Sequence, residues 1–98
     1  IVTKTRGKAM KIRQHLNVYG RVQGVGFRYR AKHMADALEL TGTVKNLSDG
    51  SVELEVQGEE GLIKEYLARL CNSTSVQVLS VDCRDCSVRA EESFVILE

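Results

Sequence analysis

The hydrophobic residues of this chain change their spacing several times, and the order of those changes constrains the fold more than any other feature. Residues 13–19 and 51–57 alternate apolar and polar side chains, which is typical of strands with one buried face. Residues 27–38 and 62–70 instead place apolar side chains three and four positions apart, as amphipathic helices do. Each of these strands precedes a helix, which points to a mixed α and β domain.

Three shorter runs complete the pattern. Residues 41–46, 76–83 and 94–97 are rich in apolar and β-branched residues and predict further strands. The alternation shifts phase between Val78 and Leu79, which predicts a β-bulge. The order is β-α-β-β-α-β with a short fifth strand. It predicts an α+β fold, a ferredoxin-like sandwich in which two helices cover one face of a mostly antiparallel sheet.

Turn signals mark the boundaries between these elements. Asp49-Gly50 predicts a hairpin turn, because this pair readily adopts the positive φ angles that such turns need. Gly58 is expected to end the strand that follows the turn, and residues 84–92 are predicted to form a polar loop.

The composition is that of a small globular protein. The chain has 98 residues, of which 43% are hydrophobic and 28% charged, so we expect one domain. A net charge of +1 does not favour a nucleic-acid partner. No apolar run approaches the ~18 residues of a membrane-spanning helix. We therefore expect a monomer with no nucleic-acid or membrane partner.

The start of the chain differs from the rest. Residues 1–9 contain neither an initiator methionine nor the apolar segment of a signal peptide, and Met10 is the expected native start. We therefore predict that residues 1–9 are a tag remnant or a disordered basic tail, and that residues 10–98 form the domain. The absence of a signal peptide and the odd number of cysteines predict a cytoplasmic protein.

The cysteines form a C-x-x-C pattern that invites a redox or zinc interpretation. Cys83 and Cys86 have this spacing, but a zinc site needs about four ligands, and neither histidine has a matching position. A redox pair would instead sit where a strand leads into a helix. We expect Cys71, Cys83 and Cys86 to be ordinary thiols, and a disulfide between two of them stays open.

The segment between the first strand and the first helix is rich in glycine and ends in an arginine. Gly20, Gly24 and Gly26 fall within seven residues, followed by Arg28. Glycines allow several N–H groups to turn toward one point, and such a concavity at a helix N-terminus suits an anion. A guanidinium adds a charged fork that matches phosphate oxygens. The segment therefore predicts a site for a phosphate-like group.

A second polar group is expected beside this loop. In the predicted fold, the strand of residues 41–46 ends on the same side of the sheet as the glycine-rich loop. Asn46 stands at that end, directly before the hairpin turn. Its amide is a candidate for contact with substrate or with water.

These two segments together resemble the acylphosphatase family. A first signature of that family is close to G-x-V-Q-G-V-x-F-R, and residues 20–28 match each of its fixed positions. The family also has a second signature further along the chain. Thr43 stands at a position where that signature usually has an aromatic residue. The resemblance extends over residues 10–98. The second signature is met, at its spacing, by Gly42, Lys45, Asn46, Gly50, Val52 and Gly58.

The resemblance implies hydrolysis of carboxylic–phosphoric mixed anhydrides to a carboxylate and inorganic phosphate, with a small-molecule acyl phosphate as substrate. It also implies that Arg28 binds phosphate and that Asn46 positions water. No metal, cofactor or covalent nucleophile is required, because the carboxylate is already a good leaving group. The loop that would cradle the phosphate consists of Gln23, Gly24, Val25, Gly26, Phe27 and Arg28.

Two other classes of function stay open. A phosphate- or carbamoyl-phosphate-binding module without turnover would need the same loop, as in the acylphosphatase-like domain of hydrogenase-maturation proteins. An RNA-binding module of the same fold would present aromatic and basic residues on the open sheet face. That face is instead predicted to be solvated and acidic, with His15 also at the surface. Its strand residues are Ser51, Glu53, Glu55 and Gln57.

Overall fold

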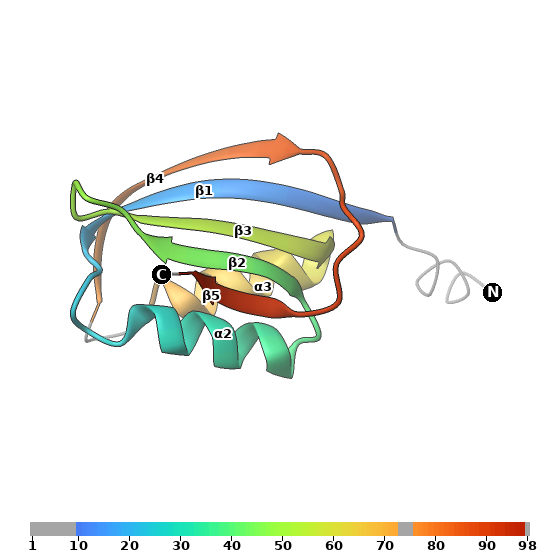
Figure 1. Ribbon diagram of the computed structural model, residues 1–98, viewed down its shortest axis with the longest axis horizontal. Coiled ribbons are helices and arrows are strands. Elements are labelled where there is room, and N and C mark those ends of the chain that lie inside the picture. Colours follow the sequence, from blue (N-terminus) through green and yellow to red (C-terminus); the bar gives the residue numbers. More distant parts are fainter. Residues whose placement is uncertain (1–9, 73–75, 98) are drawn as a thin grey trace.

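The chain folds into a five-stranded sheet with two helices on one face (Figure 1). The computed structural model describes residues 10–72 and 76–97. The strand order is β4-β1-β3-β2-β5, and only the β2–β5 pair is parallel. This confirms the predicted ferredoxin-like sandwich. The elements are β1 (Lys11–Arg21), α2 (Phe27–Ala37), β2 (Thr41–Asn46), β3 (Val52–Glu59), α3 (Glu60–Leu70), β4 (Gln77–Cys86) and β5 (Phe94–Leu97).

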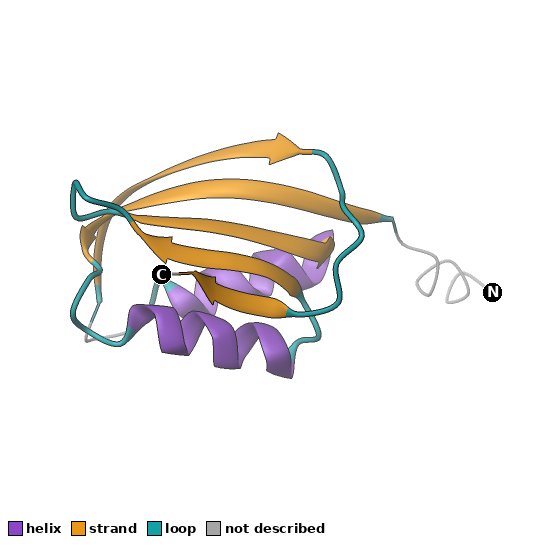
Figure 2. Ribbon diagram, in the orientation of Figure 1, coloured by secondary structure: helices purple, strands orange, loops and turns teal. Residues whose placement is uncertain are grey.

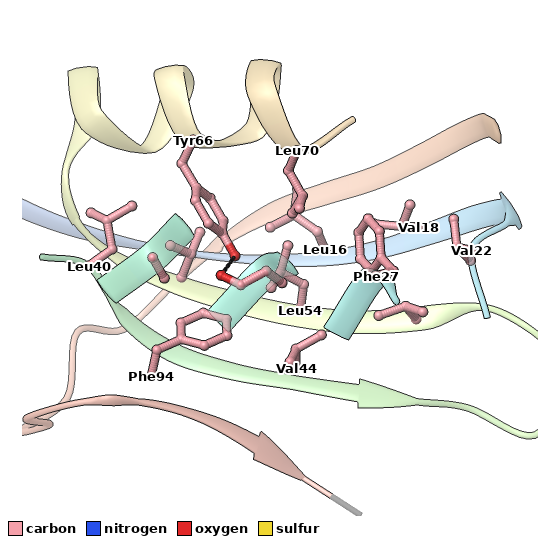
Figure 3. Packing of buried hydrophobic residues seen from close by; sticks show 14 of the residues in the cluster. Leu16, Val18, Val22, Phe27, Leu40, Val44, Leu54, Tyr66, Leu70 and Phe94 are labelled. Carbon is pink, nitrogen blue, oxygen red and sulfur yellow. Dashed lines mark hydrogen bonds between the residues drawn. The ribbon is translucent and has the colours of Figure 1, made fainter. Parts of the chain in front are cut away.

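The hydrophobic core lies between the helices and the sheet (Figure 3). Apolar residues of both helices point to it at the spacing that the sequence predicts. Tyr66 is fully buried there, and its hydroxyl donates a hydrogen bond of 2.9 Å to the carbonyl oxygen of Ala31, which ties α3 to α2. The buried helix residues are Phe27, Ala31, Ala35, Ile63, Tyr66 and Leu70.

Two strand boundaries differ from the prediction. β3 continues through Gly58 to Glu59, so Gly58 does not end the strand. Gly58 instead leaves room for the side chain of Leu40, with which a Cβ at this position would collide. β4 continues to Cys86, since the long strand β1 offers pairing partners as far as Arg13. The predicted bulge is confirmed: the β1–β4 register shifts so that Leu79 has no partner in β1.

The open face of the sheet is less solvated than its charges predict. Arg13 is 1% exposed and forms ion pairs of 2.7 Å with both Glu55 and Glu91. His15 is only 8% exposed, and its Nε2 lies 3.0 Å from a Glu53 carboxylate oxygen. The prediction of a surface histidine was therefore wrong. The segment between β4 and β5 folds back over this face and brings Glu91 to Arg13.

Several loops meet at one end of the sheet. Figure 2 shows the loop before α2 and the β2–β3 turn as teal segments at the same end. Residues 1–9, predicted to be a tail, and residues 73–75 lie outside the described residues. Among the described helices, none is long and apolar enough to cross a membrane.

Candidate active site

The loop between β1 and α2 has the backbone shape of an anion site. Gly24 and Gly26 have φ angles of 74° and 77°, in the left-handed region that favours glycine. Gly26 is the N-cap residue of α2, and no described side chain caps this helix. The first N–H groups of a helix lack partners within it and carry partial positive charge. They are therefore free to bind a negatively charged group.

Arg28 lies in the first turn of α2 and lines a pocket beside this loop. Its side chain is half-buried, and among the described residues it has no hydrogen-bond or ion-pair partner. The neighbouring arginines differ. Arg21 is exposed at the end of β1, and Arg30 is directed at the loop, where its Nη2 lies 3.5 Å from the carbonyl oxygen of Val25. Of these three, Arg28 is the one that presents its charge to the pocket.

Asn46 reaches the same pocket from β2. It is the last residue of that strand and pairs with Val52 of β3. Within the described part of the chain, its buried Oδ1 has no hydrogen-bond partner. A buried acceptor without a partner is rare in folded proteins and indicates a place for a water or a ligand. Asn46 therefore offers a neutral amide to the pocket that the glycine-rich loop and Arg28 also line.

The pocket has a volume of about 120 Å³, room for several water molecules and hence for a phosphate group. It joins residues from three parts of the chain: the loop between β1 and α2, the start of α2 and the end of β2. The lining residues are Val22, Gly24, Gly26, Phe27, Arg28, Tyr29 and Asn46.

The side chain of Gln23 holds the glycine loop against the β2–β3 turn. Its Nε2 donates hydrogen bonds to the carbonyl oxygens of Leu47 and Ser51, at 2.8 and 2.9 Å. Leu47 follows Asn46 directly in the chain. The two bonds therefore fix the distance between the glycine-rich loop and Asn46.

The structure brings together most of the predicted site residues. Gly24, Gly26, Phe27, Arg28 and Asn46 line the pocket, whereas Gln23 and Val25 do not. Gln23 points to the turn, and Val25 packs against the core. The prediction that their N–H groups bind phosphate stays a prediction.

Three features of the site were not predicted from the sequence. Val22 and Tyr29 line the pocket. The sequence offered a signal only for Tyr29, which is an aromatic residue directly after Arg28. Gly20 does not line it. It belongs to β1, where a Cβ would collide with the carbonyl oxygen of Gln77 in β4.

The C-x-x-C pattern does not form a second site. Cys83 pairs in register with Leu16 and Cys86 with Arg13, within a regular stretch of β4. Side chains three residues apart on a strand point to opposite faces, so these two thiols cannot share a metal or a disulfide within the strand. Burial and the charge of Asp85 raise the pKa of the Cys83 thiol, which keeps it protonated near neutral pH. Among the described residues, no group of histidine, cysteine or acidic side chains is placed to hold a metal ion.

The geometry suits transfer of a phosphoryl group to water. Backbone N–H groups and a guanidinium can stabilise the equatorial oxygens of a phosphoryl transition state. A side-chain amide can accept a hydrogen bond from water and direct its attack. The pocket offers both kinds of group within one small volume.

Comparison with known proteins agrees with this chemistry. The family model described as Acylphosphatase matches residues 14–96. An acylphosphatase of Clostridium perfringens is 44% identical over 82 residues, which are 83% of this chain and 92% of that protein. The crystal structure of acylphosphatase from Bacillus subtilis has a TM-score of 0.84 and 34% identity, over 89% of this chain and 99% of that one. Full-length HypF, in a phosphate- and nucleotide-bound form, has a TM-score of 0.84 and 27% identity, over 91% of this chain and 12% of HypF.

Proposed function

This chain belongs to the acylphosphatase family and hydrolyses acyl phosphates, and we propose that Arg28 binds the phosphate while Asn46 orients the attacking water. One observation supports the roles proposed for Arg28 and Asn46. Arg28, the glycine loop and Asn46, whose Oδ1 has no hydrogen-bond partner among the described residues, line a single pocket, although they come from different elements of the chain.

The loop and Arg28 act on the phosphoryl group. The N–H groups at the start of α2 and the guanidinium of Arg28 donate hydrogen bonds to the phosphoryl oxygens. These donors are held in place before the substrate arrives, so little reorganisation is needed as charge develops in the transition state. The helix dipole adds positive potential at the same point.

Asn46 acts on the nucleophile. Its Oδ1 accepts a hydrogen bond from a water molecule and holds it in line with the bond that breaks. The water oxygen bonds to phosphorus, the bond from phosphorus to the bridging oxygen breaks, and the carboxylate leaves with the electron pair. The proton of the water passes to the phosphate product or to solvent. A carboxylate of low pKa needs no general acid, so we also propose that turnover needs no metal.

The first experiment measures hydrolysis of benzoyl phosphate by the purified protein, with and without a chelator. We expect turnover that the chelator does not change and that inorganic phosphate inhibits competitively. Folded protein without turnover would exclude the enzymatic assignment, and loss of activity with the chelator would exclude the metal-free mechanism.

Variants of Arg28 test the phosphate site. Charge-assisted hydrogen bonds contribute about 1.5–3 kcal/mol each and a forked contact makes two of them, so Arg28→Ala should weaken phosphate binding at least about a hundredfold. Arg28→Lys should restore little, because an ammonium cannot form the forked contact. Arg21→Ala is the matched control, since Arg21 is exposed outside the pocket. Equal phosphate affinities in Arg28→Ala and Arg21→Ala would remove Arg28 from the site.

Asn46→Ala tests the division of roles. It should lower kcat about a hundredfold, because the water loses its guide, while phosphate affinity changes only a few-fold. Parallel losses of kcat and phosphate affinity would make Asn46 a binding or structural residue.

A binding module without turnover is the second candidate. The similarity to HypF, a much longer protein solved with phosphate, supports it. Tight phosphate binding without hydrolysis of any acyl phosphate would favour this alternative. We further propose a cytoplasmic monomer without a nucleic-acid partner, which fractionation and light scattering would test.

A further inference from the structure

A second hollow of the molecule lies between α2 and the edge strand β5. Its volume is about 370 Å³, within the range of small-molecule sites. One wall is the outer surface of α2, with Tyr29, Lys32 and His33, and the other is Ser93 with the first three residues of β5. We call this hollow the α2–β5 groove. Figure 1 shows α2 and β5 running side by side, with the C-terminal end of β5 toward the start of α2.

The α2–β5 groove lies next to the pocket that Arg28 and Asn46 line. Tyr29 lines the groove and the pocket alike. Residues four apart in a helix are neighbours on one face, so Arg28 and Lys32 form one row and Tyr29 and His33 another. On the opposite wall, β5 runs parallel to β2, and its last residue Leu97 pairs with Lys45, next to Asn46. The groove and the pocket therefore adjoin at Tyr29.

The wall of the groove is mostly apolar. Ile96 and the ring of Phe94 face the helix layer, and the tyrosine ring at position 29 is 66% exposed. The cationic head of Lys32 is already engaged, since its Nζ donates to the carbonyl oxygen of Phe94 at 2.8 Å and to an Asp36 carboxylate oxygen at 3.2 Å. Its methylene stem is left to face the groove. Such a surface favours an uncharged, apolar occupant over a second anion.

We infer that the α2–β5 groove binds the acyl group of the substrate and makes the enzyme selective for acyl phosphates with an apolar acyl chain or ring. This inference rests on the proposed function, because it places the phosphate at Arg28. The bound phosphate fixes one end of the substrate in the pocket, and the acyl group leaves the pocket past Tyr29.

The size of the groove sets the expected selectivity. Tyr29 and His33 are one helical turn apart, about 6 Å along the axis, which matches a short alkyl chain. Burial of one methylene corresponds to at most about a fourfold gain in binding, and a groove open on one side gives less. We therefore expect kcat/KM to rise about two- to threefold per methylene from acetyl to hexanoyl phosphate.

Two isoleucine variants test the groove. Ile96→Thr replaces an apolar wall by a hydroxyl, and Ile12→Thr is the matched control, because both isoleucines are partly buried against the same core. We expect the ratio of kcat/KM for hexanoyl over acetyl phosphate to fall about tenfold in Ile96→Thr and to keep its wild-type value in Ile12→Thr. Should Ile96→Thr fail to fold, His33→Glu places a carboxylate at an exposed helix position of the groove and should lower the same ratio.

The outcomes distinguish failure of the proposed function from failure of the acyl groove. A wild-type protein that hydrolyses none of the acyl phosphates would overturn the proposed function. Hydrolysis of all of them with equal kcat/KM, or an equal ratio in the Ile96 and Ile12 variants, would overturn the acyl groove alone.

A binding measurement avoids dependence on turnover. Hexanoylphosphonate, which lacks the hydrolysable oxygen bridge, should shift the backbone NMR signals of both the glycine loop and the groove residues His33 and Ile96. Inorganic phosphate should shift the loop signals only. Equal shift patterns for the two compounds would show that the acyl group lies elsewhere and would overturn the inference.

Discussion

Replacement of Gln23 should test whether the site depends on a clamp between two loops. Gln23→Ala removes the hydrogen bonds from its Nε2 to Leu47 and Ser51. Both carbonyl oxygens keep a second partner in the turn, since the Gly50 N–H donates to Leu47 and the Leu47 N–H donates to Ser51. The turn itself therefore survives, and the variant loses only the connection between the turn and the phosphate loop.

The magnitude follows from the two bonds. Each contributes about 0.5–1.5 kcal/mol, so the free energy of unfolding should fall by about 1–3 kcal/mol and Tm by about 5–15 °C. The larger effect is expected on catalysis. A small displacement of Asn46 from the glycine-rich loop would misalign the water that we propose Asn46 holds, and kcat should fall by about tenfold or more at a temperature where the variant is fully folded.

The assay compares thermal melts and benzoyl phosphate kinetics of Gln23→Ala with those of Gln14→Ala. The side chain of Gln14 forms an exposed hydrogen bond of 3.2 Å to Asp85, away from the pocket, so its loss should matter little. Gln23→Glu should be less stable than Gln23→Ala, because a carboxylate would face two carbonyl oxygens. If Tm falls in Gln23→Ala while kcat stays at the wild-type value, the clamp stabilises the fold without positioning the site.

Three further predictions concern single side chains. Asn46→Asp keeps an acceptor for water but places negative charge beside the anionic substrate, so kcat should fall and KM should rise; activity equal to wild type would instead assign a general base to this position. Burial opposes ionisation of Glu91, yet the hydrogen bonds from Arg13 and Thr41 hold the pKa of Glu91 below its ordinary value of 4.5. Its charge therefore stabilises the fold above that pH, and the stability lost in Glu91→Gln should be largest near neutral pH and should shrink below pH 4.5 in urea titrations. Tyr66→Phe removes the buried hydrogen bond to α2 and should cost about 1 kcal/mol in urea unfolding, with benzoyl phosphate kinetics unchanged because Tyr66 does not line the pocket.

Much of the fold could be predicted because its signals are local. The spacing of apolar residues within about ten positions predicts each helix and strand. The phase shift at Leu79 predicts the bulge in the same way. The site was also predictable in outline, since Arg28 and Asn46 each belong to a short segment with fixed spacing. Their common location followed from the strand order of the predicted fold.

The rest depends on contacts between segments that are far apart in the chain. In the alternating pattern of its strand, Arg13 falls on the polar side, where a half-exposed residue is expected. It is buried against Glu91 only because the segment between β4 and β5 folds back over it. Gln23 is part of a family signature, but its hydrogen bonds to the β2–β3 turn become visible only once the two loops meet. The α2–β5 groove likewise exists only because β5 pairs with β2 beside α2. Periodicity is a property of neighbours in sequence, whereas burial, clamps and grooves are properties of neighbours in space, and these the tertiary structure alone decides.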